Sequence, residues 1–441
     1  MTTGTADTRR SEEPSVVEPS FWRKLHRLEL PTDQTTAEDV RPVLLVLGLP
    51  TFGLAFAITI LTTYGPSVLL SLTHSPARVG ALIGGEGAFA LVVPLISGAV
   101  SDRLPGKTPG AKRMPFVLIG GPMVGAGLVI LPFAPGVSLG GISILMFFVG
   151  YYLYYPPYRA IYADILPKRL QPRAQSSQAI LRGAGFGVAL IAGGLLLGAW
   201  TPLPFVIGAA VIAMSTVALK PVVRLQNADT GEEDEPALSA RDLFLHHRQM
   251  QIFAAANSLW EFSLAGLKTF VILYLTHGLH RSSQLASACL ALVAIAFIVG
   301  APIASRLAER VGIARVMMVA AAVYGATLCL GVFPTSLGPM LLILPVCAFA
   351  GSILMTLPQA LAFTLAPDGS EGAAAGLVDF SRGVGVVLGP AAVGGIVGLF
   401  SDSLSSTAGY AIMWPTIGVP VLVSLFFLRR FENQSVATAA T

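Results

Sequence analysis

Charged residues are few in this sequence. Asp, Glu, Lys and Arg make up only 12% of its 441 residues, whereas hydrophobic residues make up 54%. Soluble domains carry roughly 25% charged residues, and a chain with about half that share could not cover its surface with polar groups. The composition therefore excludes a water-soluble globular protein and predicts that a lipid bilayer surrounds most of the chain.

Cysteine is scarce as well. Cys289, Cys329 and Cys347 all lie within apolar runs and show no paired spacing, so they predict neither a disulfide framework nor a metal site. The modest formal net charge of +4 gives no indication of a nucleic-acid partner. Neither a nucleophile–base grouping nor a phosphate-binding loop between a strand and a helix points to an enzyme or a cofactor.

Long apolar runs are what the sequence has in abundance. The first of them begins at Val43, after a polar start in which we expect no cleavable signal peptide. A bilayer core of roughly 30 Å needs about 20 apolar residues per helix. Twelve segments qualify as spans: 43–70, 77–100, 116–134, 140–163, 176–199, 203–221, 251–276, 284–305, 313–333, 338–365, 372–399 and 407–428.

A polar stretch with an acidic run at 229–236 separates the first six spans from the last six. We therefore predict an all-α membrane protein with twelve transmembrane helices in two six-helix bundles. Its predicted parts are a tail at 1–42, a bundle at 43–221, a connector at 222–250, a bundle at 251–428 and a tail at 429–441.

Lysine and arginine gather on one side of the predicted spans. With the N-terminus placed inside the cell, the loops of that side hold 22 of the 28 basic residues, against only Arg78 and Arg281 on the other side. Basic loops favour the cytoplasm. The sequence predicts a multi-pass protein of the cell membrane with both termini in the cytoplasm.

The two halves of the chain repeat one another. Arg182-Gly-Ala-Gly in the fifth span matches Arg382-Gly-Val-Gly in the eleventh, 200 residues later. The segment 98–103 after the second span is echoed by 301–306 after the eighth. Many transporters build two bundles around a central site from such repeats.

These segments also carry a family resemblance. The letters GAVSDR at 98–103, followed by GAKRMPF at 110–116, resemble the cytoplasmic loop motif of the major facilitator superfamily, in the form of the sucrose/proton symporters and their bacterial relatives. The letters PYRAIYADILP at 157–167 are similar to a motif of the glycoside–pentoside–hexuronide symporter group. The resemblance implies the major facilitator fold and symport of a sugar with a proton or another monovalent cation.

Charged groups at such loops can hold one face of a transporter shut and release it when the bundles move. We expect gating roles for Asp102, Arg103, Asp164, Arg306 and Arg382. The alternative for the loop motif is an anchor that only fixes the topology. For the two matching arginines of the fifth and eleventh spans, snorkelling towards the cytoplasmic side is an adequate explanation.

Ionisable residues inside the spans are candidates for ion coupling, because a charge at the bilayer centre costs at least about 2.5 kcal/mol. Glu261 and Lys268 lie seven residues apart on one face of the seventh span and are the favoured working site. A carboxylate there could alternate between protonation, which burial favours, and pairing with the lysine. The alternative is a purely structural ion pair.

Two further acids are coupling candidates. Glu86 has no charged neighbour in its own span, so it is either protonated or has a partner on another helix. It would serve as a proton carrier or as an interhelical hydrogen-bonding group. Asp379 stands three residues before Arg382, a spacing at which the two can form a helix-locking pair.

Four tyrosines, at positions 151, 155, 158 and 162, form a stripe along the fourth span. Aromatic rings suit the apolar face of a sugar and an arginine donates to its hydroxyls, although part of the stripe can be a membrane anchor. The candidate substrate contacts are Tyr155, Arg159, Asn257, Trp260 and Gln359. The last of these stands 200 residues after Arg159.

The leading prediction is a monomeric secondary transporter that works by alternating access, with proton-coupled symport of a sugar, a glycoside or a similar small polar solute. One alternative is a proton antiporter that exports a drug or metabolite; the number of polar groups facing the cavity would discriminate the two. A different class is a non-transporting receptor or assembly factor on the same scaffold, for which Glu261→Gln and Asp102→Asn would leave function intact.

Overall fold

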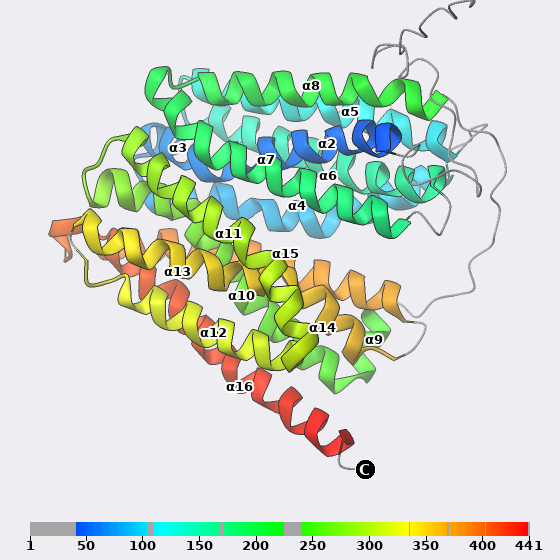
Figure 1. Cartoon of the computed structure of the whole chain (residues 1–441). Coiled ribbons are helices and arrows are strands. Elements are labelled where there is room, and N and C mark those ends of the chain that lie inside the picture. The colour runs from blue at the N-terminus through cyan, green and yellow to red at the C-terminus, as the bar shows by residue number, and fades with distance from the viewer. Residues whose placement is uncertain are drawn as a thin grey trace, which may run out of the picture.

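The computed structural model describes residues 41–103, 109–166, 171–224, 240–334, 336–367, 370–401 and 403–439. Regular structure in these residues is helical, and the long helices lie in two groups, α2–α8 and α9–α16 (Figure 1). A hydrocarbon core offers no water to the backbone, and an α-helix satisfies its own amide and carbonyl groups. The apolar runs therefore become helices, and the predicted all-α class is confirmed.

The first group forms the N-terminal bundle. Its helices are α2 (Arg41–Thr59), α3 (Gly65–Thr73), α4 (Pro76–Arg103), α5 (Pro109–Ile130), α6 (Val137–Ile165), α7 (Gln171–Ala199) and α8 (Leu203–Arg224). A π-helical turn at Ile60–Tyr64 joins α2 to α3, so that the two form a single span, Pro42–Thr73.

The second group forms the C-terminal bundle. Its helices are α9 (Ala240–His246), α10 (Arg248–Leu273), α11 (Ser283–Val311), α12 (Ile313–Leu330), α13 (Leu337–Thr356), α14 (Pro358–Leu365), α15 (Glu371–Leu399) and α16 (Met413–Ala439). A π-helical turn at Tyr274–Gly278 extends α10, just as one extends α2. Helices α13 and α14 form one span, Leu337–Leu365.

The described residues contain eleven helical segments that are long and apolar enough to cross a membrane. The remaining predicted span, 203–221, corresponds to α8, whose apolar part Leu203–Leu219 is shorter. The chain is a multi-pass membrane protein. Prolines such as Pro94 in α4 and Pro390 in α15 lie inside these helices, where neighbouring helices can compensate for the missing backbone donor.

The internal repeat is visible in the helix bounds. Helix α15 begins and ends 200 residues after α7, and the span formed by α13 and α14 begins and ends 200 residues after α6. The predicted relationship between the two halves is therefore confirmed at the level of whole helices, beyond the short motifs on which it was based.

The polar connector differs in detail from the prediction. Helix α8 continues to Arg224, and the short helix α9 lies within the stretch predicted as connector, where Leu243 is fully buried. Residues 225–239, which include the whole acidic run, lie outside the described residues. At the other end of the chain, α16 continues to Ala439, well past the span predicted to end at 428.

The two bundles touch closely along α4 and α15. A Cβ atom on Gly80, Gly84 or Gly87 of α4 would lie under 3.0 Å from a carbonyl oxygen of α15, at Pro390, Val387 and Gly383 respectively. Small residues of this kind let membrane helices approach to backbone contact. We call this contact the α4–α15 seam. Its contacts run from the middle of each helix into the part remote from the connector, which we call the far end.

A second contact between the bundles joins α7 to α11. A Cβ atom on Gly194 would collide with Ser287, and one on Gly198 would lie 2.5 Å from the side-chain nitrogen of Gln284. Tyr64, at the end of the first π-helical turn, reaches the same place, with its hydroxyl 3.4 Å from Ser287 Oγ. These contacts also lie at the far end, so the bundles are packed tightly together there.

Candidate functional site

Helices α10 and α15 pack with their backbones almost in contact. A Cβ atom on Gly385 would lie 2.5 Å from the carbonyl oxygen of Ser258 and 2.7 Å from Cβ of Glu261. Ser258 Oγ donates to the carbonyl oxygen of Ser381 at 3.0 Å, which fixes the register of the two helices. This register places Glu261 of α10 beside Arg382 of α15.

The two side chains form an ion pair. Arg382 Nε lies 3.8 Å from Glu261 Oε2. The glutamate is 15% exposed and the arginine 49% exposed. After Arg382, the charges that act most on Glu261 are those of Lys268, Glu86 and Asp379. We call these five residues the charge network.

The pairing differs from the one that the sequence favoured. Glu261 and Lys268 share a face of α10, but seven residues correspond to about 10 Å of helix rise, which is too far for direct contact. Asp379 is close enough along α15 to pair with Arg382, yet the guanidinium lies beside the acid of α10 instead. Spacing within one helix could not show which groups face each other across two helices.

Glu86 brings the N-terminal bundle into the network. It is buried in α4, and its Oε1 accepts a hydrogen bond of 3.1 Å from the hydroxyl of Tyr152 on α6. The sequence left open whether Glu86 is protonated or has a partner on another helix, and the structure shows such a partner in Tyr152. After Glu261, the groups that act on Arg382 are Tyr152, Asp379 and Glu86, so the network spans both bundles.

The tyrosine stripe of α6 divides into two parts. The rings of Tyr151 and Tyr155 are stacked, with centroids 5.7 Å apart. The hydroxyl of Tyr158, by contrast, lies 2.7 Å from Thr51 Oγ1 of α2 and 3.0 Å from the hydroxyl of Tyr162, and both of these rings are buried. The second pair therefore holds α6 against α2, and only the first pair remains available to a ligand.

Two arginines lie against the ring of Tyr155. The guanidinium of Arg159 is 5.6 Å from the ring centroid, and that of Arg182, on α7, is 5.7 Å away. Arg182 also donates a hydrogen bond of 2.5 Å to the Tyr155 hydroxyl. Both arginines are exposed. The sequence interpretation included Arg159 but assigned Arg182 no ligand role, although its match with Arg382 at the repeat offset was a signal for it.

Asn257 and Trp260 serve helix packing. Asn257 is 1% exposed and donates to Ser381 Oγ at 2.7 Å. Trp260 is fully buried, and its Nε1 donates to Ser424 Oγ of α16 at 2.8 Å. Gln359 is exposed in the first turn of α14. Substrate contact for these three residues stays a prediction.

Replacing Asn257 by Ala is expected to lower the free energy of unfolding by about 1–3 kcal/mol, because it leaves buried polar groups of α15 without their donor. Thermal unfolding of the detergent-solubilised protein measures the change. The variant Gln359→Ala, at an exposed position, is the control and is expected to stay within about 0.5 kcal/mol of the parent. An unchanged stability for Asn257→Ala with a raised KM for uptake would contradict the packing role.

The predicted gating residues lie near the connector end of the helices. Asp102 and Arg103 are the last residues of α4, and Asp164 is close to the end of α6, but all three side chains lie outside the described part of the structure. Arg306 is exposed on α11. Their gating roles remain predictions, whereas Arg382 lies in the charge network.

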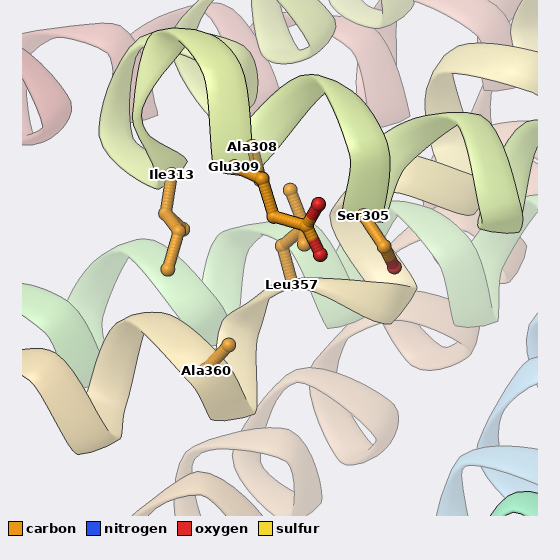
Figure 2. Close-up of a pocket in the computed structure, with 6 residues that line it drawn as sticks. All are labelled: Ser305, Ala308, Glu309, Ile313, Leu357 and Ala360. Carbon is orange, nitrogen blue, oxygen red and sulfur yellow. The ribbon is translucent and has the colours of Figure 1, made fainter.

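A small hollow lies between α11, α12 and α14. Figure 2 shows its lining, with Glu309 above it: Ser305, Ala308, Glu309, Ile313, Leu357 and Ala360. Its volume is about 250 Å³, and pockets that enclose a ligand usually exceed roughly 300 Å³. Since it contains no part of the charge network, we do not regard it as the substrate site.

Known structures share this architecture. The nucleoside transporter NupG superposes with a TM-score of 0.70 at 20% identity, covering 88% of this chain and 99% of its own. A bacterial homologue of the human lysosomal transporter Spinster, in an inward-facing and occupied conformation, gives 0.72 at 16% identity, with 89% and 96% covered. The peptide transporter POT gives 0.68 at 14% identity, with 93% and 98% covered.

These likenesses establish the fold: two six-helix bundles arranged as in the major facilitator transporters. The predicted fold class is thus confirmed. Residues 253–440, within the second half of the chain, also match the sequence model of the family described as the Major Facilitator Superfamily. A search among curated proteins finds no match to the chain. The symporter group that the sequence motifs resembled is not among the families matched.

Proposed function

We propose that this protein is a secondary active transporter of the cell membrane that couples proton movement to the symport of a small polar solute, such as a sugar or glycoside. The observation that carries the proposal is the ion pair of Glu261 and Arg382, which lies within two apolar spans and is linked to Glu86 of the other bundle. Ionisable groups inside a membrane are expensive and usually mark an ion or substrate path.

The arrangement supports a state that is closed at the far end and open towards the connector. The glycine contacts of the α4–α15 seam extend into the far end. Arg159, Arg182 and Arg382 are exposed although they belong to membrane-spanning helices. Exposure of such charges to lipid would be costly, so their exposure suits a water-filled opening between the bundles. With the predicted topology, this opening faces the cytoplasm, where both termini lie.

The charge network stands where the seam ends. Glu86 and Gly87 are neighbours on α4, Arg382 and Gly383 are neighbours on α15, and the two glycines are in backbone contact. A proton on Glu261 would remove the charge that holds Arg382 and so alter the position of α15. Because α15 also forms the seam, protonation and opening of the far end are coupled through one helix, as alternating access requires.

Uptake into proteoliposomes with an imposed proton gradient, over a panel of sugars, glycosides and sugar acids, tests the proposal. We expect uphill accumulation of at least one solute, and we expect a protonophore to abolish it. Expulsion of apolar cations without any sugar accumulation would favour the proton antiporter instead. A protein that moves no solute in either direction would contradict transport and favour the receptor or assembly factor.

A further inference from the structure

The groups that surround Tyr155 offer hydrogen-bond donors. A guanidinium group has five N–H donors and no acceptor, and those of Arg159 and Arg182 both lie against the tyrosine ring. The tyrosine hydroxyl already accepts a hydrogen bond from Arg182, which leaves its own hydrogen free to donate. A ligand at this place therefore meets three donor groups, and acceptors on the ligand are the groups that fit.

The charged groups that lie against Tyr155 are both cations. Neither Arg159 nor Arg182 forms an ion pair within 4 Å with a carboxylate of the described residues, whereas Arg382 forms one with Glu261. The described carboxylates of the charge network, Glu86, Glu261 and Asp379, act on Arg382 of α15 and form no ion pair with Arg159 or Arg182. A cation inside a membrane span calls for a partner of opposite charge.

We propose that the transported solute is an organic anion whose carboxylate binds between the guanidinium groups of Arg159 and Arg182, with the Tyr155 hydroxyl as a third donor. Arginine pairs with a carboxylate through parallel charge-assisted hydrogen bonds. The inference rests on the proposed transport function and narrows its substrate class.

A neutral sugar fits this place less well. Each of its hydroxyl groups is a donor as well as an acceptor, and the donors would face guanidinium groups that cannot accept them. The rings of Tyr155 and Tyr151, stacked with centroids 5.7 Å apart and both partly exposed, can contact the uncharged remainder of the solute. The carboxylate end of the solute is thus fixed by charge and the rest by packing against rings.

The test is gradient-driven uptake of matched pairs by the full-length protein in proteoliposomes. The pairs are D-glucuronate with D-glucose, D-galacturonate with D-galactose, lactate with 1,2-propanediol and benzoate with benzyl alcohol, and glucose 6-phosphate is added as a phosphate probe. We expect accumulation of at least one carboxylate without accumulation of its neutral counterpart. Arg159→Gln and Arg182→Gln are each expected to reduce that uptake at least tenfold, chiefly through a raised KM.

Matched variants separate binding from folding. Tyr155→Phe keeps the ring and removes the third donor, so we expect a smaller loss than for either arginine. Arg310→Gln, at an exposed position near the end of α11, is the control and is expected to transport normally. Where a Gln variant elutes as misfolded protein, the Lys variant at the same position keeps the charge and is expected to retain the preference for the carboxylate.

Two different outcomes would overturn the inference. Accumulation of a neutral solute or of glucose 6-phosphate, with no preference for any carboxylate, would show that the solute is not a carboxylate while leaving proton-coupled transport in place. Normal carboxylate uptake in folded Arg159→Gln and Arg182→Gln variants would show that the anion binds elsewhere. Failure of every probe to accumulate under a gradient would instead contradict the proposed function itself.

Discussion

Replacing Glu261 by Gln is expected to abolish accumulation driven by a proton gradient while exchange of the solute across the membrane continues. Glutamine has nearly the shape of glutamic acid but cannot bind or release a proton in the physiological range. A gradient of one pH unit stores about 1.4 kcal/mol per proton, which supports roughly tenfold accumulation for one proton per solute. The variant should therefore only let the solute reach its own electrochemical equilibrium across the membrane, without accumulation driven by the proton gradient.

The measurement compares gradient-driven uptake with exchange of labelled solute in the same proteoliposomes. Glu309→Gln is the matched control, because Glu309 is an exposed glutamate near the end of α11, away from the charge network. Full accumulation by Glu261→Gln would refute the coupling role. If the variant loses both exchange and accumulation, and thermal unfolding shows an intact protein, Glu261 takes part in substrate binding.

Much of the fold could be predicted because the bilayer permits few solutions. Long apolar runs must become helices in lipid, so counting runs of about 20 residues located the spans without any knowledge of packing. The repeat was equally accessible, because two copies of one architecture keep their offset: α7 and α15 share the offset of 200 that the arginine motifs showed. The π-helical turns were missed because they lie in apolar runs, where composition cannot distinguish a π-helical turn from an α-helix. Helix α9 was missed because it is short and lies in the polar connector.

The site could be predicted only in part, since charges inside a membrane are easy to find and their partners are not. Glu261, Glu86 and Arg382 all stood out as ionisable groups in apolar spans, and all three belong to one network. Their contacts run between helices, however, and depend on how glycines such as Gly385 let α15 approach α10. A pattern along one helix carries no information of that kind.

Neighbours in sequence also face different neighbours in space. Successive residues of a helix point about 100° apart. Trp260 therefore contacts α16 while Glu261, the next residue, contacts α15. Tyr152 was overlooked for the same reason, because it lies beside the tyrosine stripe of α6 and points towards Glu86.

A methyl group at Gly80 is expected to prevent closure of the far end and to lower transport at least tenfold. The Cβ atom of Gly80→Ala would lie under 3.0 Å from the carbonyl oxygen of Pro390, and a backbone atom of a packed helix cannot move aside cheaply. Overpacking of this kind costs about 1–3 kcal/mol, which corresponds to a shift of roughly 5- to 150-fold between two conformations. The shift should favour the state in which α4 and α15 are apart.

Gly85→Ala provides the matched control on the same helix, because a Cβ atom there meets nothing within 4 Å. Each substitution is combined with Ala391→Cys, next to Gly84 in the seam, after the three native cysteines have been replaced. A membrane-impermeant maleimide added outside the vesicle should label the cysteine several-fold faster with Gly80→Ala than with Gly85→Ala. Equal labelling and equal transport would mean that the seam does not open during the transport cycle. The route by which the solute reaches Tyr155 from the far end would then have to lie elsewhere.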